Sequence, residues 1–246
     1  METVIDLNCD VGEGIGNEKD ILPLISSCNI ACGGHAGDII TMQNVTKLAK
    51  EHHVKVGAHP SYPDRENFGR VSIYMPKEKL IETLKEQIDR LISVLRTEEI
   101  PLHHIKPHGA LYNDVAKKKE LALIFLEGIE AYRAKTFLYV PYGSIIEKLA
   151  RKKRFHIKLE AFGDRAYTEN LSLVPRSRSN AMIEDPKAVF EHLLFMIKKG
   201  RVKTIAGNTV KIKADTYCIH GDTPLALEIL MYLSKTLPNK AIYIKK

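Results

Sequence analysis

The sequence predicts a closed, irregular barrel of seven parallel strands, each followed by helical or loop segments. Two observations support this fold class. Short β-branched runs alternate with longer helical runs along the whole chain, and clusters of His, Asp and Gly follow almost every strand-like run. The alternation implies a parallel sheet covered by helices. The carboxyl ends of all strands meet on one face of a barrel, whereas an open sheet would leave its edge strands far from a central site. The clusters therefore favour closure.

The strand-like runs are short, bounded by turn residues and separated by helical patterns, as expected for βα units. In chain order we expect the strands at Val4–Cys9, Cys28–Cys32, Val54–Ala58, His103–Lys106, Thr136–Val140, Ile157–Phe162 and Asp215–Ile219.

The helices between the strands show apolar residues at spacings of three and four. Three have clear limits: Pro76–Leu95, Pro186–Lys199, and one that starts at Thr223-Pro224 and ends before Pro238. Pro76 suits the first turn of the first of these helices. Asp185 is the expected N-cap of the second, and Gly200 is its expected stop signal.

Bulk properties bound the function. The chain has 246 residues, 44% hydrophobic residues and a net charge of +7, which fits one globular domain spanning residues 1–246. The basic residues are scattered as on solvated helix faces, so we expect no nucleic-acid partner. No apolar run approaches membrane-spanning length and no secretory signal is evident, so we expect no membrane association and a cytoplasmic location.

Four histidines stand out because each lies one to three residues beyond an expected strand end, beside Gly or Pro. They are His35, His59, His108 and His220. The other six are expected to be structural: His52, His53, His103, His104, His156 and His192. The four selected side chains, with the acidic residues near them, indicate an active site at the barrel mouth.

Common cofactor and nucleophile motifs are absent from the sequence. No Gly-Lys pair occurs, which excludes a P-loop, and there is no G-x-S-x-G elbow. Residues 12–16 read G-x-G-x-G and lack the spacing of a dinucleotide loop. A catalytic transition metal stays open, because Asp10, His35, His59 and His220 are suitable ligand types, although no H-x-x-x-H or H-x-E pair supports it.

The clusters together resemble the LamB/YcsF family of 5-oxoprolinase A subunits. The matching runs are residues 6–13, 29–38, 57–64, 106–113, 164–167 and 220–224. The chain departs from the family pattern at Gly34, Val71, Gly163 and residues 173–176, which concern fine substrate contacts.

This resemblance implies a fold related to the glycoside hydrolase/deacetylase barrel. It also implies ATP-dependent opening of a small lactam, 5-oxo-L-proline (pyroglutamate), to L-glutamate, with ATP and Mg²⁺ as cofactors. The chain would then work with two partners, 5-oxoprolinase subunits B and C. Because the sequence has no P-loop, ATP would bind in an atypical barrel-mouth pocket or at a partner interface.

For this chemistry we expect the general base to be one of the four selected histidines, which the sequence does not rank. The expected catalytic residues are Asp10, Glu13, His35, His59, His108 and His220. The expected substrate-binding residues are Asn8, Lys106, Tyr112, Asn113, Asp164, Arg165 and Asp222. Lys106 and Arg165 are the cations suited to carboxylate or phosphate oxygens. Two alternatives are a stand-alone metal-dependent amidohydrolase or deacetylase, and a non-catalytic subunit that only binds the lactam.

Overall fold

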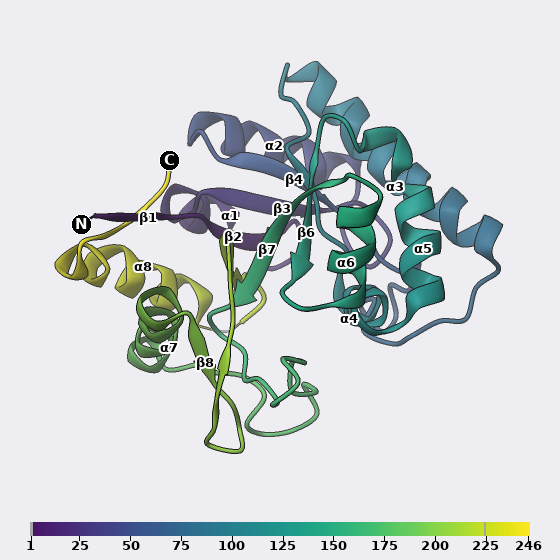
Figure 1. Ribbon diagram of the computed structural model, residues 1–246. Helices are drawn as coiled ribbons and strands as arrows, with labels where there is room; N and C mark the ends of the chain where they lie inside the picture. The colour runs from purple at the N-terminus through teal and green to yellow at the C-terminus, as the bar shows by residue number, and fades with distance from the viewer. Residues whose placement is uncertain (1, 224) are drawn as a thin grey trace.

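The computed structural model describes residues 2–223 and 225–246, and within these ranges seven strands form a closed, all-parallel barrel (Figure 1). Going round the barrel, the strands are β10 (Thr216–His220), β2 (Leu7–Val11), β3 (Ser27–Ala31), β4 (Lys55–His59), β5 (His104–Ile105), β6 (Phe137–Pro141) and β7 (His156–Phe162). β10 pairs with both β2 and β7, which closes the sheet. The expected barrel of seven parallel strands is confirmed.

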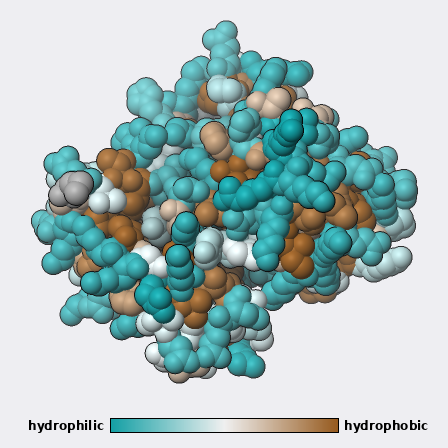
Figure 2. Space-filling model, in the orientation of Figure 1, coloured by the Kyte–Doolittle hydropathy of each residue, from teal (hydrophilic) through white to brown (hydrophobic). Residues whose placement is uncertain are grey.

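Helices pack around the outside of the barrel. They are α1 (Glu18–Ile21), α2 (Ile39–Glu51), α3 (Lys77–Thr97), α4 (Gly109–Lys117), α5 (Lys119–Gly128), α6 (Ile145–Lys152), α7 (Pro186–Lys199) and α8 (Ala226–Thr236), with short 3-10 turns at Leu22–Leu24, Glu130–Tyr132 and Pro238–Lys240. The stripe of α3 that was expected to be apolar is buried, including Leu84 and Ile88. No helix in the described ranges combines the length and the apolar character needed to cross a membrane, and hydrophilic residues cover most of the face in Figure 2.

Helix limits follow the local sequence. α7 begins and ends as expected, with the Asp185 carboxylate accepting a hydrogen bond from the Ala188 amide at 2.7 Å and Gly200 in the left-handed region at φ 59°. Pro76 is the N-cap of α3 and not part of its first turn, since its ψ of 145° is extended. The last helix begins at Ala226, later than expected; the expected start includes Pro224, which lies outside the described residues.

Two small sheets were not predicted. The expected first strand is divided: β1 (Thr3–Ile5) pairs with β11 (Ile242–Ile244) outside the barrel, and β2 begins only at Leu7. The two chain ends therefore lie close together (Figure 1). β8 (Arg201–Lys203) and β9 (Thr209–Lys211) form an antiparallel hairpin that extends away from the barrel.

The barrel interior is polar below its mouth. The Asn29 amide donates to the side-chain oxygen of Asn8 at 2.8 Å, and the Asn8 amide donates to Glu160 at 3.0 Å. His104 lies fully buried and donates to Asn29 at 2.6 Å. Gly57 makes room for this ring, because a Cβ there would lie 2.1 Å from the Nε2 of His104. The hydrogen-bonded interior supports the side chains above it, as buried polar groups must be paired.

Candidate active site

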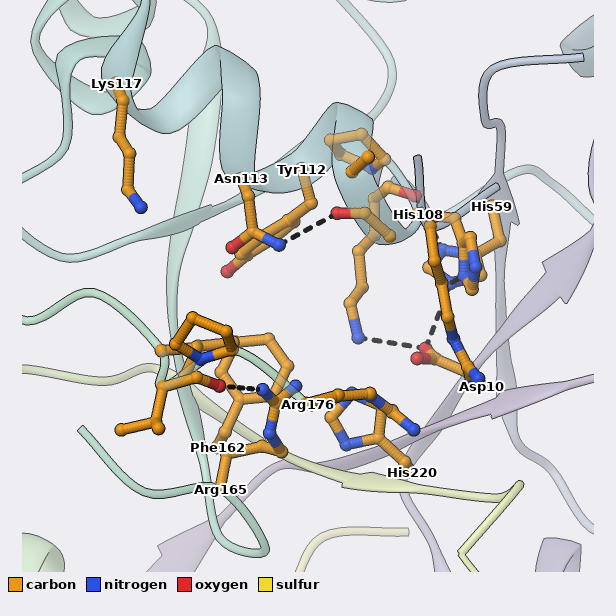
Figure 3. Close-up of a pocket in the computed structure, with 18 of the residues that line it drawn as sticks. Asp10, His59, His108, Tyr112, Asn113, Lys117, Phe162, Arg165, Arg176 and His220 are labelled. Atoms are coloured by element: carbon orange, nitrogen blue, oxygen red, sulfur yellow. Dashed lines mark hydrogen bonds and ion pairs between the residues drawn. The ribbon is translucent and has the colours of Figure 1, made fainter. Parts of the chain in front are cut away.

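A cavity of about 440 Å³ opens at the carboxyl ends of the barrel strands (Figure 3). This is within the usual size of a small-molecule site. It is lined by Asp10, His59, Arg70, Lys106, Pro107, His108, Gly109, Ala110, Tyr112, Asn113, Lys117, Phe162, Arg165, Leu173, Val174, Pro175, Arg176, Ser177 and His220. A second cavity of about 370 Å³ adjoins it and shares Tyr112 and Phe162 in its wall.

The floor of the cavity is a buried ion cluster centred on Lys106. Its Nζ lies 2.9 Å from Asp10 Oδ1, 3.0 Å from Glu160 Oε1 and 3.1 Å from Cys218 Sγ. Burial alone would lower the pKa of Lys106, but Asp10, Cys218 and Glu160 raise it well above its usual value. Burial would likewise raise the pKa of the Asp10 carboxyl, but His59 and Lys106 hold it well below its usual value. Both groups are therefore charged, and the lysine is neutralised by carboxylates.

One wall carries an acid–imidazole pair. The Nδ1 of His220 donates to Asp164, with its two oxygens at 2.9 and 3.0 Å, and Asp164 also accepts from the His220 amide at 2.8 Å. Burial would raise the pKa of the Asp164 carboxyl, but its contacts with His220 lower it overall. Phe162 stacks on the imidazole at a centroid distance of 5.3 Å. This orientation leaves the Nε2 of His220 free to accept a proton in the cavity.

The opposite wall holds three imidazoles around one carboxylate. Glu13 Oε1 lies 2.9 Å from His35 Nε2, 3.2 Å from His108 Nδ1 and 3.9 Å from His59 Nε2. The rings of His35 and His108 stack in parallel at 3.6 Å. His59, from the end of β4, meets His108 edge-on.

Burial sets the charges in this histidine cluster. Burial and the neighbouring His108 lower the pKa of His35 to about 3. Burial also lowers the pKa of His108, although Glu13 opposes the shift. Burial would raise the pKa of the Glu13 carboxyl, but its hydrogen bonds with His108 and His35 hold it well below its usual range. At neutral pH the cluster thus contains a carboxylate with neutral His35 and His108 rings.

The rim of the cavity is cationic. Arg70 and Arg176 both pair with Asp222, and the Arg176 Nη1 lies 3.2 Å from its Oδ2. Arg165 is 6% exposed, and within the described ranges its guanidinium donates to backbone carbonyls, including that of Val174 at 2.7 Å. Burial and the charge of Arg176 lower the pKa of Arg165 to about 10. Three guanidinium groups beside one rim carboxylate give an anion-attracting surface.

The expected site residues divide into three groups by position. Those in the cavity wall are Asp10, His59, Lys106, His108, Tyr112, Asn113, Arg165 and His220. Those directly behind the wall are Glu13, His35 and Asp164. Asn8 lies beneath the floor, with its amide bonded to Glu160 and Thr216, and Asp222 lies at the rim between two arginines.

Sequence reasoning missed four residues of this site: Glu160, Cys218, Arg70 and Arg176. Glu160 left a signal, because a charged residue inside an otherwise buried strand indicates an ion facing the barrel interior. Cys218 occupies the same expected strand as His220, two residues earlier, and hence the same face. The two arginines come from long loops, for which strand patterns give no indication of position.

Known proteins that resemble this chain point to one family. The sequence model of the LamB/YcsF family matches residues 5–246. The chain is 38% identical to the 5-oxoprolinase A subunit of Pyrococcus furiosus, over 98% of this chain and 96% of that protein. It is 39% identical to the 5-oxoprolinase A subunit of Haemophilus influenzae strain PittEE, over 98% of each chain. The crystal structure of the lactam utilization protein from Thermus thermophilus matches with a TM-score of 0.92 and 36% identity, over 99% of each chain.

Proposed function

The chain belongs to the LamB/YcsF family, and on that premise we propose that it is the A subunit of an ATP-dependent 5-oxoprolinase. The reaction converts 5-oxo-L-proline to L-glutamate while ATP becomes ADP and phosphate. The observation that carries the proposal is the barrel-mouth cavity, in which an oriented base, a buried ion cluster and a cationic rim face one space. Relatives named as the A subunit of 5-oxoprolinase supply the substrate.

The cationic rim suits the charges of this reaction. The substrate has a carboxylate, and a phosphorylated intermediate would carry further negative charge. Arg165 and Arg176 lie where such oxygens enter the cavity, and guanidinium groups bind carboxylate and phosphoryl oxygens as bidentate forks. Lys106 was the other expected anion-binding cation. Its neutralisation by Asp10 and Glu160 favours a role in holding the floor.

Coupling to ATP overcomes the low reactivity of the lactam. Transfer of the γ-phosphoryl group to the carbonyl oxygen releases ADP and makes the carbonyl carbon electrophilic. Water adds to that carbon, the ring C–N bond breaks, and the nitrogen leaves as the amine, which gives an acyl phosphate. A second water hydrolyses the acyl phosphate to the side-chain carboxylate and inorganic phosphate. His220, with Asp164 behind it, is positioned to take the proton from an attacking water.

The proposal includes two partner subunits, B and C, and a cytoplasmic location. Relatives are named as A subunits, which supports a complex of several chains. The ATP, with Mg²⁺, binds either in the barrel mouth, where the adjoining cavity offers space, or at an interface with the partners. The four cysteines are free thiols in the structure, as a reducing compartment requires.

Reconstitution tests this function. The purified chain, alone and mixed with candidate B and C subunits, would be incubated with 5-oxoproline, and glutamate release would be measured with ATP, without ATP and with a non-hydrolysable ATP analogue. We expect glutamate only from the mixture with ATP. Absence of glutamate from every mixture would reject the substrate, and release by the chain alone without ATP would favour a stand-alone amidohydrolase.

A further inference from the structure

The hydrogen bonds of His59 and His108 fix which nitrogen of each ring carries a proton. His59 Nδ1 lies 2.7 Å from the Lys106 carbonyl oxygen, and His108 Nε2 lies 2.9 Å from the Phe68 carbonyl oxygen. A carbonyl oxygen only accepts, so each of these nitrogens must donate. When the rings are neutral, the remaining nitrogens, His59 Nε2 and His108 Nδ1, therefore carry lone pairs.

These two lone-pair nitrogens point at each other. They are 3.0 Å apart, and Glu13 Oε1 lies 3.2 Å from the His108 nitrogen and 3.9 Å from the His59 nitrogen. Three acceptors thus converge with no donor hydrogen between them. All three side chains are at least nine-tenths buried, with exposed fractions of 1% for His59, 6% for His108 and 8% for Glu13. Converging buried acceptors are costly unless a cation lies between them.

The spacing of the three atoms fits coordination of one metal ion. Nitrogen and oxygen ligands lie about 2.0–2.2 Å from a tetrahedral zinc ion, which places them roughly 3.3–3.6 Å from each other. The observed separations of 3.0, 3.2 and 3.9 Å lie on both sides of this range. Two imidazoles and a carboxylate are also ligand types that such a cation prefers.

The surroundings match those of a metal ligand set. Ligating histidines usually donate their other ring N–H to a carbonyl or carboxylate, which fixes the tautomer, and both His59 and His108 do so. His35 donates to Glu13 at 2.9 Å and would hold the carboxylate in place. His59 and His108 line the cavity, whereas Glu13 lies behind them. A fourth coordination position would therefore open into the cavity, as in catalytic sites.

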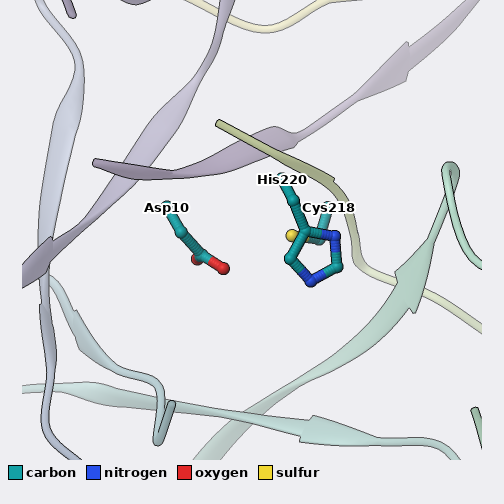
Figure 4. Close-up of side chains that lie close together, drawn as sticks. All are labelled: Asp10, Cys218 and His220. Carbon is teal, nitrogen blue, oxygen red and sulfur yellow. The ribbon is translucent and has the colours of Figure 1, made fainter. Parts of the chain in front are cut away.

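A second group of ligand-type side chains does not carry the same inference. Asp10, Cys218 and His220 also lie close together (Figure 4). The ammonium group of Lys106 already lies 2.9 Å from Asp10 and 3.1 Å from Cys218. A cation is thus built into that position by the chain itself. Within the described residues, the group of Glu13, His59 and His108 is the better candidate.

We infer that Glu13, His59 and His108 bind a divalent transition cation of the zinc class at the wall of the cavity. Such an ion supplies Lewis acidity beside the reacting carbonyl. Its use in lactam opening rests on the proposed function, whereas its binding can be measured without substrate. The rival occupant is a proton shared between the two imidazoles.

Metal uptake by the full-length chain tests the inference. The protein would be stripped with a chelator, dialysed against Zn²⁺ or Co²⁺ and passed through a desalting column before elemental analysis. The absorption spectrum of the Co²⁺ form would also be recorded. We expect about one ion per chain and the visible bands of tetrahedral cobalt coordinated by nitrogen and oxygen. No retained ion in the wild-type chain would overturn the inference in favour of the shared proton.

Matched variants locate the ion. Glu13→Gln and His108→Gln should each lower the retained metal by about tenfold or more. His53→Asn should bind as the wild type does, because His53 is an exposed residue at the end of α2. Full retention in both site variants would overturn the assignment. The wild-type cobalt spectrum stays decisive even where a variant fails to fold. Metal binding without any glutamate release in reconstitution would reject the proposed function alone, and glutamate release without metal would reject the ion alone.

Discussion

The Nδ1 of His220 lies 2.9 and 3.0 Å from the two carboxylate oxygens of Asp164, so the imidazole is fixed with its Nε2 toward the cavity. This relationship selects His220 from the four histidines that the sequence left unranked. The other three share Glu13 on the opposite wall. His220 has its own carboxylate, and hence the arrangement of an oriented general base.

Replacing Asp164 by Asn should slow turnover with little change in KM. The amide cannot stabilise a protonated His220, and it can present its NH₂ group to the ring and favour the wrong tautomer. We expect kcat to fall by about 10²- to 10⁴-fold. Steady-state glutamate release by the assembled complex measures this. Asp20→Asn, at an exposed position, is the matched control, and equal kcat values for the two variants would remove His220 as the base.

Asp164 should also make stability depend on acidic pH. Its pKa is lower in the folded chain than its ordinary value, which is about 3.9 in an unfolded chain. The contribution is therefore fully present above about pH 4 and is lost as the pH falls through the lower folded pKa. Denaturant unfolding at a series of pH values should show a shallower acid decline for Asp164→Asn than for the wild type. Identical pH slopes would contradict the assigned contacts of this carboxylate.

Lys106→Met should destabilise the fold, because it leaves Asp10 and Glu160 buried without their shared cation. Removing one partner of a buried ion pair costs about 3–5 kcal/mol. Adding Glu160→Gln should restore part of that loss, since one buried charge is then removed. The free energy of unfolding from denaturant titration measures both effects.

A surface lysine provides the comparison for Lys106. Lys50 pairs with Glu98 at 3.7 Å, and its side chain is 53% exposed. Lys50→Met should change the free energy of unfolding by less than about 1 kcal/mol. Similar losses at the two positions would show that the ion cluster does not hold the floor of the cavity.

Arg165→Lys should weaken substrate binding more than it slows chemistry. Lysine keeps the charge but loses the planar fork that binds two oxygens at once. A charge-assisted hydrogen bond is worth about 1.5–3 kcal/mol, so KM for 5-oxoproline should rise by roughly ten- to a hundredfold. Arg201→Lys, on the exposed hairpin strand β8, serves as the control. An unchanged KM would place the substrate anion elsewhere on the rim.

The barrel was predictable because its determinants are local. Each expected strand carries its own turn signals and is followed by polar residues, and closure followed from the number of strands that carry them. The division of the first strand was not predictable in this way. β1 is paired by β11, more than 200 residues away in the chain, and strand runs alone do not encode such a pairing.

The candidate site was predictable in composition but not in arrangement. Residues at strand ends, such as His59 and His220, were named because all strand ends meet on one face. Their division between two walls depends on which strands are neighbours in the barrel. Arg176 was missed because its loop crosses the barrel mouth, and its meeting with Asp222 joins residues 46 positions apart. Contacts of that kind arise from packing of the whole chain.

The central claim is that the barrel mouth of this chain carries the lactam-opening chemistry. The most direct test is ATP-dependent glutamate release by a complex assembled with the His220→Gln chain, compared with the wild-type complex. Assembly of the variant complex would be verified by size-exclusion chromatography. We expect the variant to assemble normally but to release glutamate at least about a hundredfold more slowly. Wild-type turnover by the variant complex would contradict the claim and favour a chain that binds the lactam without catalysing its opening.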